Sequence, residues 1–192
     1  DGQIELVSAH DYLTDAARFS TRRAQVINLC PSYRYQSVGY YVSLLAEARG
    51  HRPLPTVATI QDLTALEIMK IRSGELDAVI QRSLAPLKSD YFELSCYFGR
   101  NVAERHNRLA AALFSVFAVP LMRATFRRRG AIWYLKGIRA VGKRDIPEAH
   151  EPHVVAAMQR LVERRRGPKK STWQARYHLA ILVDPQEDDP PS

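Results

Sequence analysis

The segment PSYRYQSVGYY, residues 31–41, gathers the side chains of this chain best suited to binding a ligand. It follows an apolar run and precedes a helical pattern, where backbone N–H groups and the helix dipole favour an anion. Arg34 is suited to clamping a carboxylate or phosphate through two hydrogen bonds, while Ser37 caps the helix and Gly39 permits close approach. The candidate binding residues are Tyr33, Arg34, Tyr35, Gln36, Ser37, Gly39 and Tyr40.

A structural role for the same segment stays open. Its tyrosines would then pack the preceding strand onto the following helix, and Arg34 would pair with a local carboxylate. The spacing matches neither a Walker loop nor a dinucleotide-binding fingerprint, because both need several glycines and this segment has one.

A basic block carries the formal net charge of +8. Residues 123–170 hold 14 basic and 4 acidic side chains, against 13 and 12 in residues 1–122 and 1 and 4 in residues 171–192. Basic side chains close to Trp133 and Tyr134 suit single-stranded nucleic acid, and they equally suit docking on an acidic protein face. A solvated charged turn is the structural alternative. The candidate patch is Arg123, Arg127, Arg128, Arg129 and Lys136.

The histidines and cysteines predict no metal site and no catalytic residue. His150 and His153 are separated by Glu151 and Pro152, so they lack the i, i+4 spacing that places two histidines on one helix face. The two cysteines, Cys30 and Cys96, lie in apolar strand-like runs and are interpreted as buried, reduced thiols of a cytoplasmic protein. A nucleophilic Cys30 is the alternative, although no partner base is evident.

The elements around the candidate segment form a recognisable unit. The apolar run Gln25–Cys30 predicts a buried strand, and a shorter strand is expected at Ile4–Ser8. A helix capped by Ser37 and stopped by Gly50 follows, and residues 51–55 read as an extended return. Strand, loop, helix and strand in this order are typical of a βαβ unit.

The second half predicts helices around a β-hairpin, with Arg129 and Gly130 at its turn. The sequence therefore favours a mixed α/β (α+β) fold with a βαβ-like N-terminal half. The expected elements are helices Thr59–Ile71 and Leu76–Ala85, a strand Tyr91–Phe98, a helix Asn101–Phe117 capped by Asn101, the hairpin strands Pro120–Arg127 and Ala131–Val141, and a helix His153–Arg166.

Length and composition complete the domain prediction. The 192 residues, 46% hydrophobic and 25% charged, are ordinary for a soluble globular protein. No apolar run approaches the roughly 18 residues that span a bilayer. We expect one domain over residues 1–166, a basic linker at 167–176, and at 177–192 the first strand and loop of a second, truncated domain.

Residues 28–55, NLCPSYRYQSVGYYVSLLAEARGHRPLP, resemble the RLAN domain found in front of RimK-like ATP-grasp ligases. The resemblance extends through FELSCYFG and RRRGAIWYLKGI, and YHLAILVDPQEDDPPS resembles the linker and opening strand of the ATP-grasp portion. In that family, the ATP-grasp portion activates a carboxylate as an acyl phosphate, and an amine then attacks to form an amide.

The resemblance implies a division of labour. ATP and Mg²⁺ would belong to the ATP-grasp domain of the parent ligase, acting in cis, and this chain alone would have no cofactor and no catalysis. It would then be an accessory domain that recognises an amino acid, a peptide or an acidic protein. Two alternatives remain: a nucleic-acid-binding module using residues 123–170, or a dimerisation domain using the hairpin at residues 123–141 and the helix at residues 101–117. We expect a cytoplasmic protein with no membrane partner, and a homo-oligomer stays open.

Overall fold

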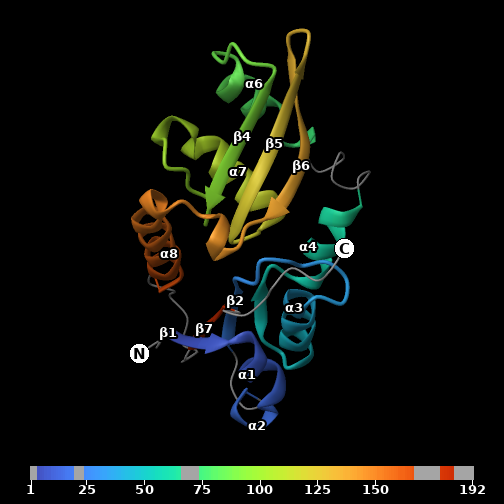
Figure 1. Cartoon of the computed structure of the whole chain (residues 1–192), viewed down its shortest axis with the longest axis vertical. Coiled ribbons are helices and arrows are strands. Elements are labelled where there is room, and N and C mark those ends of the chain that lie inside the picture. Colours follow the sequence, from blue (N-terminus) through green and yellow to red (C-terminus); the bar gives the residue numbers. More distant parts are fainter. Residues whose placement is uncertain (1–3, 20–23, 66–73, 167–177, 184–192) are drawn as a thin grey trace. The chain divides into compact units, whose positions relative to one another are not determined.

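The computed structural model describes residues 4–19, 24–65, 74–166 and 178–183 (Figure 1). Its contacts divide the chain into unit 1, Asp1–Ile60 with Ser171–Ser192, and unit 2, Gln61–Lys170. Each unit holds one small sheet with helices, so the mixed α+β class is confirmed. The sequence analysis placed residues 1–166 in a single domain and did not foresee this division.

Unit 1 is built on a four-stranded parallel sheet with the order β1-β7-β2-β3. Its strands are β1 (Ile4–Ser8), β2 (Ala24–Asn28), β3 (Arg52–Leu54) and β7 (His178–Val183). Val26, Ile27 and Asn28 are all buried, because β2 lies inside the sheet between β7 and β3. Inner strands of a parallel sheet are typically apolar throughout, so the buried amide of Asn28 stands out.

The helices of unit 1 are α1 (Ala9–Thr14), α2 (Ala16–Phe19) and α3 (Val38–Ala48). β2, α3 and β3 form the predicted βαβ unit, with β2 and β3 parallel and adjacent. α3 ends as predicted at Gly50, whose φ of 72° is in the left-handed region, and the N–H of His51 donates to Ala46 O at 2.9 Å. α1 packs against α3, and Tyr12 of α1 is fully buried.

The last described strand has a position that the sequence analysis did not foresee. The sequence predicts a strand at residues 177–183 as the opening strand of a separate ATP-grasp portion. In the structure, β7 pairs in parallel with β1 on one side and with β2 on the other. It therefore lies in the sheet of unit 1. That an ATP-grasp portion follows this strand stays a prediction.

Unit 2 is built on an antiparallel sheet of three strands, β4 (Tyr91–Tyr97), β5 (Leu121–Arg129) and β6 (Ile132–Ala140). The predicted hairpin is confirmed, with Gly130 at φ 59° in its turn. The helices are α4 (Val57–Thr64), which begins in unit 1, α6 (Asp77–Leu84), α7 (Asn107–Phe117) and α8 (Glu151–Arg166), with short 3₁₀ turns η1 (Glu104–His106), η2 (Lys143–Asp145) and η3 (Glu148–His150).

Helices α6 and α7 cover one face of this sheet, which we call the inner face. Cys96 of β4 is fully buried and its Sγ donates to Ala110 O of α7 at 3.4 Å. Gln81 of α6 joins the backbone of Trp133 in β6, accepting from its N–H at 2.9 Å and donating to its carbonyl. The other buried side chains on this face include Leu94, Met122, Ala124, Phe126 and Leu135.

Three predicted helices have a boundary that differs from the structure by two residues or more. Asn101 caps no helix, because its amide closes the turn after β4, donating to Ser95 O at 2.7 Å and accepting from the N–H of Ala103 at 2.8 Å. α7 therefore begins at Asn107. α8 begins at Glu151, ahead of the predicted start. α4 ends at Thr64, and residues 66–71 of the predicted helix lie outside the described residues.

Within the described part of the chain, no helix is both long enough and apolar enough to cross a lipid bilayer.

Candidate functional site

The elbow, which we define as residues 29–37 between β2 and α3, is anchored by the side chain of Asn28. This buried amide donates to Gly39 O at 2.7 Å and to Ser43 Oγ at 2.9 Å, both in α3. Its Oδ1 accepts from the N–H of Cys30 at 3.1 Å. One side chain thus connects the end of β2, the start of the elbow and α3, and it satisfies three polar groups that burial would otherwise leave unpaired.

Two of the candidate binding residues point into the protein. Tyr33 is buried, and its hydroxyl donates to Asn28 O at 2.6 Å. At Gly39, an added Cβ would lie 2.2 Å from Ser32 O and 2.9 Å from a ring carbon of Tyr33. The close approach that the sequence predicted at Gly39 is therefore made by the elbow's own backbone.

Ser37 is the N-cap of α3, as predicted. Its Oγ accepts from the N–H of Tyr40 at 3.2 Å and donates to Ser32 O at 3.1 Å. The hydroxyl proton is therefore directed at the elbow itself. Gln36, one residue earlier, is exposed with a φ of 68°, a left-handed conformation that is uncommon outside glycine.

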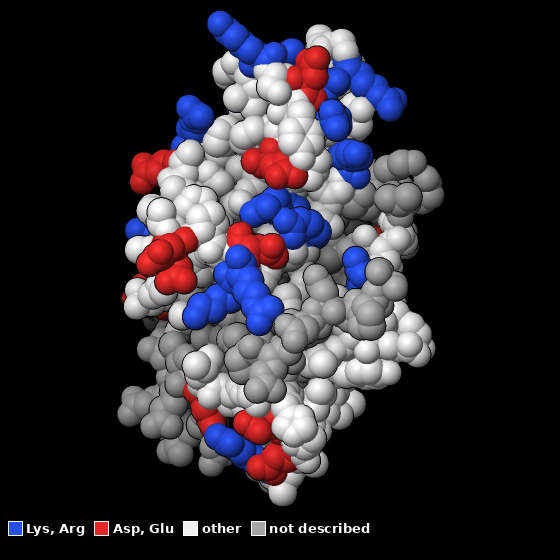
Figure 2. All heavy atoms as spheres, in the orientation of Figure 1, with Lys and Arg blue, Asp and Glu red and all other residues white. Residues whose placement is uncertain are grey.

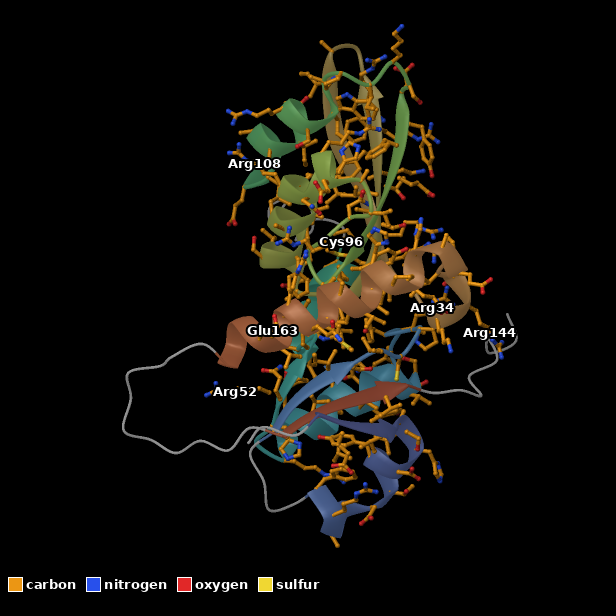
Figure 3. The ribbon with its side chains drawn as sticks, turned by 90° about the vertical axis from the view of Figure 1, so that its left-hand side faces the viewer. Arg34, Arg52, Cys96, Arg108, Arg144 and Glu163 are labelled. Atoms are coloured by element: carbon orange, nitrogen blue, oxygen red, sulfur yellow. The ribbon has the colours of Figure 1, made fainter. Side chains whose placement is uncertain are left out.

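The elbow presents an aromatic and cationic surface to solvent. Arg34 is exposed, and the side chain of Tyr35 is 75% exposed. The rings of Tyr35 and Tyr40 meet edge to face with centroids 5.4 Å apart, and Tyr40 meets Tyr41 in the same way at 5.6 Å. We call Arg34, Tyr35, Tyr40 and Tyr41 the elbow surface. Figure 3 shows Arg34 and Arg52 projecting on opposite sides of the view.

The predicted basic patch lies on the hairpin of unit 2, and most of it faces away from α6 and α7. On this outer face, Arg127 of β5 lies in one cross-strand row with Tyr91 of β4 and Tyr134 of β6. The Arg127 guanidinium stacks on the Tyr91 ring at 4.6 Å, and the Arg129 guanidinium stacks on the Tyr134 ring at 5.1 Å.

A depression of about 430 Å³ opens on the outer face beside this row. One of its lining residues is Gly137, where an added Cβ would meet nothing within 4 Å. Lys136 is exposed and lies at a bulge, unpaired between Leu135 and Gly137. The lining residues are Tyr91, Thr125, Arg127, Lys136, Gly137, Ile138 and Arg139.

Arg128 differs from the other patch candidates because it lies on the inner face. It forms an ion pair with Asp90 at 2.8 Å and donates to Leu87 O and Lys88 O, both at 3.1 Å. Its guanidinium lies 5.6 Å from the centroid of the Trp133 ring. Arg128 therefore holds the loop between α6 and β4 onto the hairpin and does not share the outer face with Arg127 and Arg129.

Arg123 and Arg139 share a second row of the outer face, and both are linked to Asp145. Arg123 donates to Asp145 O at 3.3 Å, and Arg139 lies 3.6 Å from the Asp145 carboxylate. Near Tyr91, the Glu93 carboxylate accepts from the tyrosine hydroxyl, and this hydrogen bond raises the pKa of Tyr91. Tyr91 therefore stays a neutral aromatic side chain at physiological pH.

The histidines and cysteines form no reactive group in the described residues. His150 Nδ1 lies 3.0 Å from the Tyr97 hydroxyl, while His153 is exposed on α8. No three His, Cys, Asp or Glu side chains among the described residues converge on a point that could hold a metal ion. Burial raises the pKa of Cys96 to about 12, so its thiol remains protonated and unreactive. Cys30 is buried as well.

A family model for the RimK-like ATP-grasp N-terminal domain, RLAN, matches residues 9–157, well over half of the chain. The chain belongs to the RLAN family. Comparisons with curated proteins and with solved structures gave no match. The RLAN match begins at α1 in unit 1 and ends within α8 in unit 2, so the family is defined across both units and ends before β7.

Sequence reasoning missed three important residues of this RLAN domain. Asn28 was counted within an apolar run, yet an amide at the end of an inner strand is the kind of residue that must find partners. Tyr91 and Arg139 were predicted to lie in strands, but the face of the sheet on which each lies was not predicted. Tyr91 alternates with the apolar Phe92 and Leu94, a signal that could have placed it on the solvent-facing side of the strand. The side of Arg139 depends on the bulge at Lys136, which the sequence does not mark.

Proposed function

We propose that this RLAN domain is a non-catalytic accessory domain of a RimK-like ATP-grasp ligase that joins a carboxylate to an amine. The observation that carries this proposal is the family match over residues 9–157. The partner is an ATP-grasp domain in the same polypeptide, and the substrate is an amino acid, a peptide or an acidic protein. A cytoplasmic location agrees with two free cysteines, since reducing compartments keep thiols unpaired.

In this proposal the elbow surface takes part in recognising the substrate or its carrier. The buried bonds of Asn28, Tyr33 and Ser37 fix the backbone, so exposed groups on the same loop are held in place before a ligand arrives. Tyrosine and arginine are the side chains most enriched at binding hot spots. An exposed arginine also recognises a carboxylate through two parallel hydrogen bonds, which suits the acid partner of an amide ligation.

We assign Mg²⁺ and ATP to the ATP-grasp domain rather than to this chain. The junction ahead of α3 is occupied by Ser32 O against Gly39, which leaves no glycine cradle for phosphates. The described carboxylates and histidines do not gather into a metal-binding set. ATP activates the carboxylate in the ATP-grasp domain of the family, and the proposed contribution of this chain is binding and orientation.

The experiment compares ligation by the natural gene product and its variants. The purified protein is incubated with Mg-ATP and panels of amino acids and peptides, and ADP release and product mass are measured. We expect an ATP-dependent product whose mass equals the two substrates less one water. Arg34→Ala should lower kcat/KM at least about tenfold, because one charge-assisted contact is lost. Arg52→Ala, an exposed arginine of β3 in the same unit, is the matched control.

The outcomes separate the parts of the proposal. If Arg34→Ala forms the product with full activity, the ligase assignment stands, but the elbow surface has no role in substrate recognition. A complete gene product with no ATP-dependent condensation on any acid–amine pair would reject the ligase assignment. Binding of Mg-ATP by the 192-residue chain alone, seen as a rise in its thermal unfolding temperature, would reject the non-catalytic role.

A further inference from the structure

Among the described helices of unit 2, α6 and α7 cover the inner face of its sheet. On the outer face, the contact between Tyr97 and His150 covers the end of β4 that lies towards α8. The other end of β4 and the neighbouring parts of β5 and β6 carry exposed or half-buried side chains. Figure 1 shows this face of β4, β5 and β6 towards the viewer, and Figure 2 shows Lys and Arg atoms gathered over it, with acidic atoms between them.

The outer face carries an excess of positive charge. Among the described residues, the carboxylates of its strands and of η2 are Glu93 and Asp145, and both already have partners, the Tyr91 hydroxyl and the Arg139 guanidinium. Five cations share the face with these two anions, so the local potential favours an anionic partner. The cations are Arg123, Arg127, Arg129, Lys136 and Arg139.

The same face offers flat surfaces for stacking. Tyr91 is 40% exposed and Tyr134 is half-buried, and each ring carries an arginine guanidinium at 4.6 or 5.1 Å. Because Arg127 stands between the two tyrosines in one cross-strand row, rings and guanidinium planes follow one another across three strands. Nucleobases stack on aromatic rings and on guanidinium planes alike.

The depression at Gly137 adds a place for one base. Its volume of about 430 Å³ lies within the range of small-molecule sites, and Gly137 contributes no side chain to it. Tyr91, Thr125 and the cations Arg127, Lys136 and Arg139 are among its lining residues. Aromatic, polar and cationic groups around one hollow match the three parts of a nucleotide.

We propose that the outer face of β4, β5 and β6 binds single-stranded nucleic acid. One base occupies the depression over Gly137 beside Tyr91, and the flanking phosphates lie on Arg127, Lys136 and Arg139. An acidic polypeptide would contact the cations, but it would not use the cross-strand row of tyrosine and arginine side chains or the depression. The inference concerns unit 2 alone and does not rest on the proposed ligase role.

The experiment measures binding of fluorescently labelled single strands of about 10 nucleotides by anisotropy, using the 192-residue chain. RNA, DNA, a DNA duplex and poly-glutamate are compared between about 50 and 200 mM salt. We expect tighter binding of a single strand than of the duplex. Three phosphate contacts predict a slope of about −2 in log K against log salt. The RNA and DNA arms identify which nucleic acid is preferred.

Two variants separate base contacts from phosphate contacts. Gly137→Val adds a side chain whose Cβ meets nothing within 4 Å, and it should weaken binding about tenfold or more while leaving the salt slope unchanged. Lys136→Ala should weaken binding less and reduce the slope by about 0.7. Arg108→Ala, an exposed arginine of α7 on the other side of the sheet in Figure 3, should change neither. Circular dichroism and thermal unfolding check that each variant is folded.

The proposal is overturned by any of three results. These are no single-strand binding at low salt, binding of poly-glutamate in place of nucleic acid, and equal affinity for duplex and single strand with no effect of Gly137→Val. The last result would show a cation surface without a base site. If Gly137→Val fails to fold, an unchanged salt slope in Lys136→Ala is sufficient to reject the phosphate contacts.

Discussion

The elbow of unit 1 and the outer face of unit 2 are both rich in tyrosine and arginine, yet they are built in opposite ways. In the elbow, Tyr33, Ser37 and Gly39 face inward and hold an irregular backbone, which leaves a small surface around Arg34. On the outer face, the strands supply the geometry, so side chains of alternate residues point to solvent without a special frame. A segment rich in aromatic and polar residues can therefore serve mainly to fix the backbone of its own loop.

The sharpest test of this difference uses two glycines. Gly39→Ala places a Cβ 2.2 Å from Ser32 O, so the elbow has to shift, and we expect a loss of about 3 kcal/mol in the free energy of unfolding. Gly137→Ala meets open space on a strand and should change stability by no more than about 1 kcal/mol, in the stabilising direction. Urea unfolding measures both. Equal losses in the free energy of unfolding at the two positions would contradict the difference between the crowded Gly39 and the open Gly137.

The second test concerns the buried frame of the elbow. Asn28→Ala removes two donated hydrogen bonds and one accepted bond, leaving Gly39 O, Ser43 Oγ and the N–H of Cys30 with fewer partners. We expect a loss of about 2 kcal/mol in the free energy of unfolding, together with faster hydrogen exchange in the elbow. Arg34→Ala, on the exposed side of the same elbow, should stay within about 0.5 kcal/mol of the parent. A costly Arg34→Ala would show that the elbow surface also stabilises the fold.

These two regions also show what could be read from the sequence. The strand–elbow–helix order, the Ser37 cap and the Gly50 stop are local features, and they were predicted because hydrophobic period and capping chemistry are contained in neighbouring residues. The orientation of Tyr33 could not be read, because nothing in the segment distinguishes an inward from an outward tyrosine. The strand position of β7 depends on pairing with residues about 150 positions earlier. Neighbouring residues of a strand always lie on opposite faces, but which of Arg127 and Arg128 faces α6 and α7 depends on how β5 packs.

The third test separates neighbouring arginines of β5. Arg128→Ala removes an ion pair with Asp90 and two hydrogen bonds to the carbonyls of Leu87 and Lys88. The ion pair is partly exposed to solvent. The expected loss in the free energy of unfolding is about 1 to 2 kcal/mol. Arg127→Ala removes an exposed stacking contact on Tyr91 and should cost about 0.5 kcal/mol. Chemical unfolding measures the two variants. If Arg127→Ala lost more free energy of unfolding than Arg128→Ala, the structural role would belong to Arg127 and the exposed one to Arg128.

The smallest expected effect concerns the two buried histidines. His51 of unit 1 pairs its Nδ1 with the Tyr12 hydroxyl at 2.7 Å, whereas His106 of unit 2 packs its ring on Phe92 at 5.0 Å between centroids. Burial, with a further contribution from Arg105, lowers the pKa of His106 below its ordinary value of 6.5. The unfolded chain therefore binds a proton at this position more readily than the folded chain does.

The free energy of unfolding should consequently decrease as the pH falls below about 6.5, where the unfolded imidazole becomes protonated first. His106→Leu removes this contribution, so its stability should decrease less between about pH 7.5 and 5.5 than that of the parent chain. Urea unfolding across this range measures the difference, and His153→Leu, on the exposed part of α8, is the matched control. If His106→Leu loses as much stability on acidification as the parent, the packing of unit 2 around Phe92 accommodates the charged ring, and the contrast between the two buried histidines does not hold.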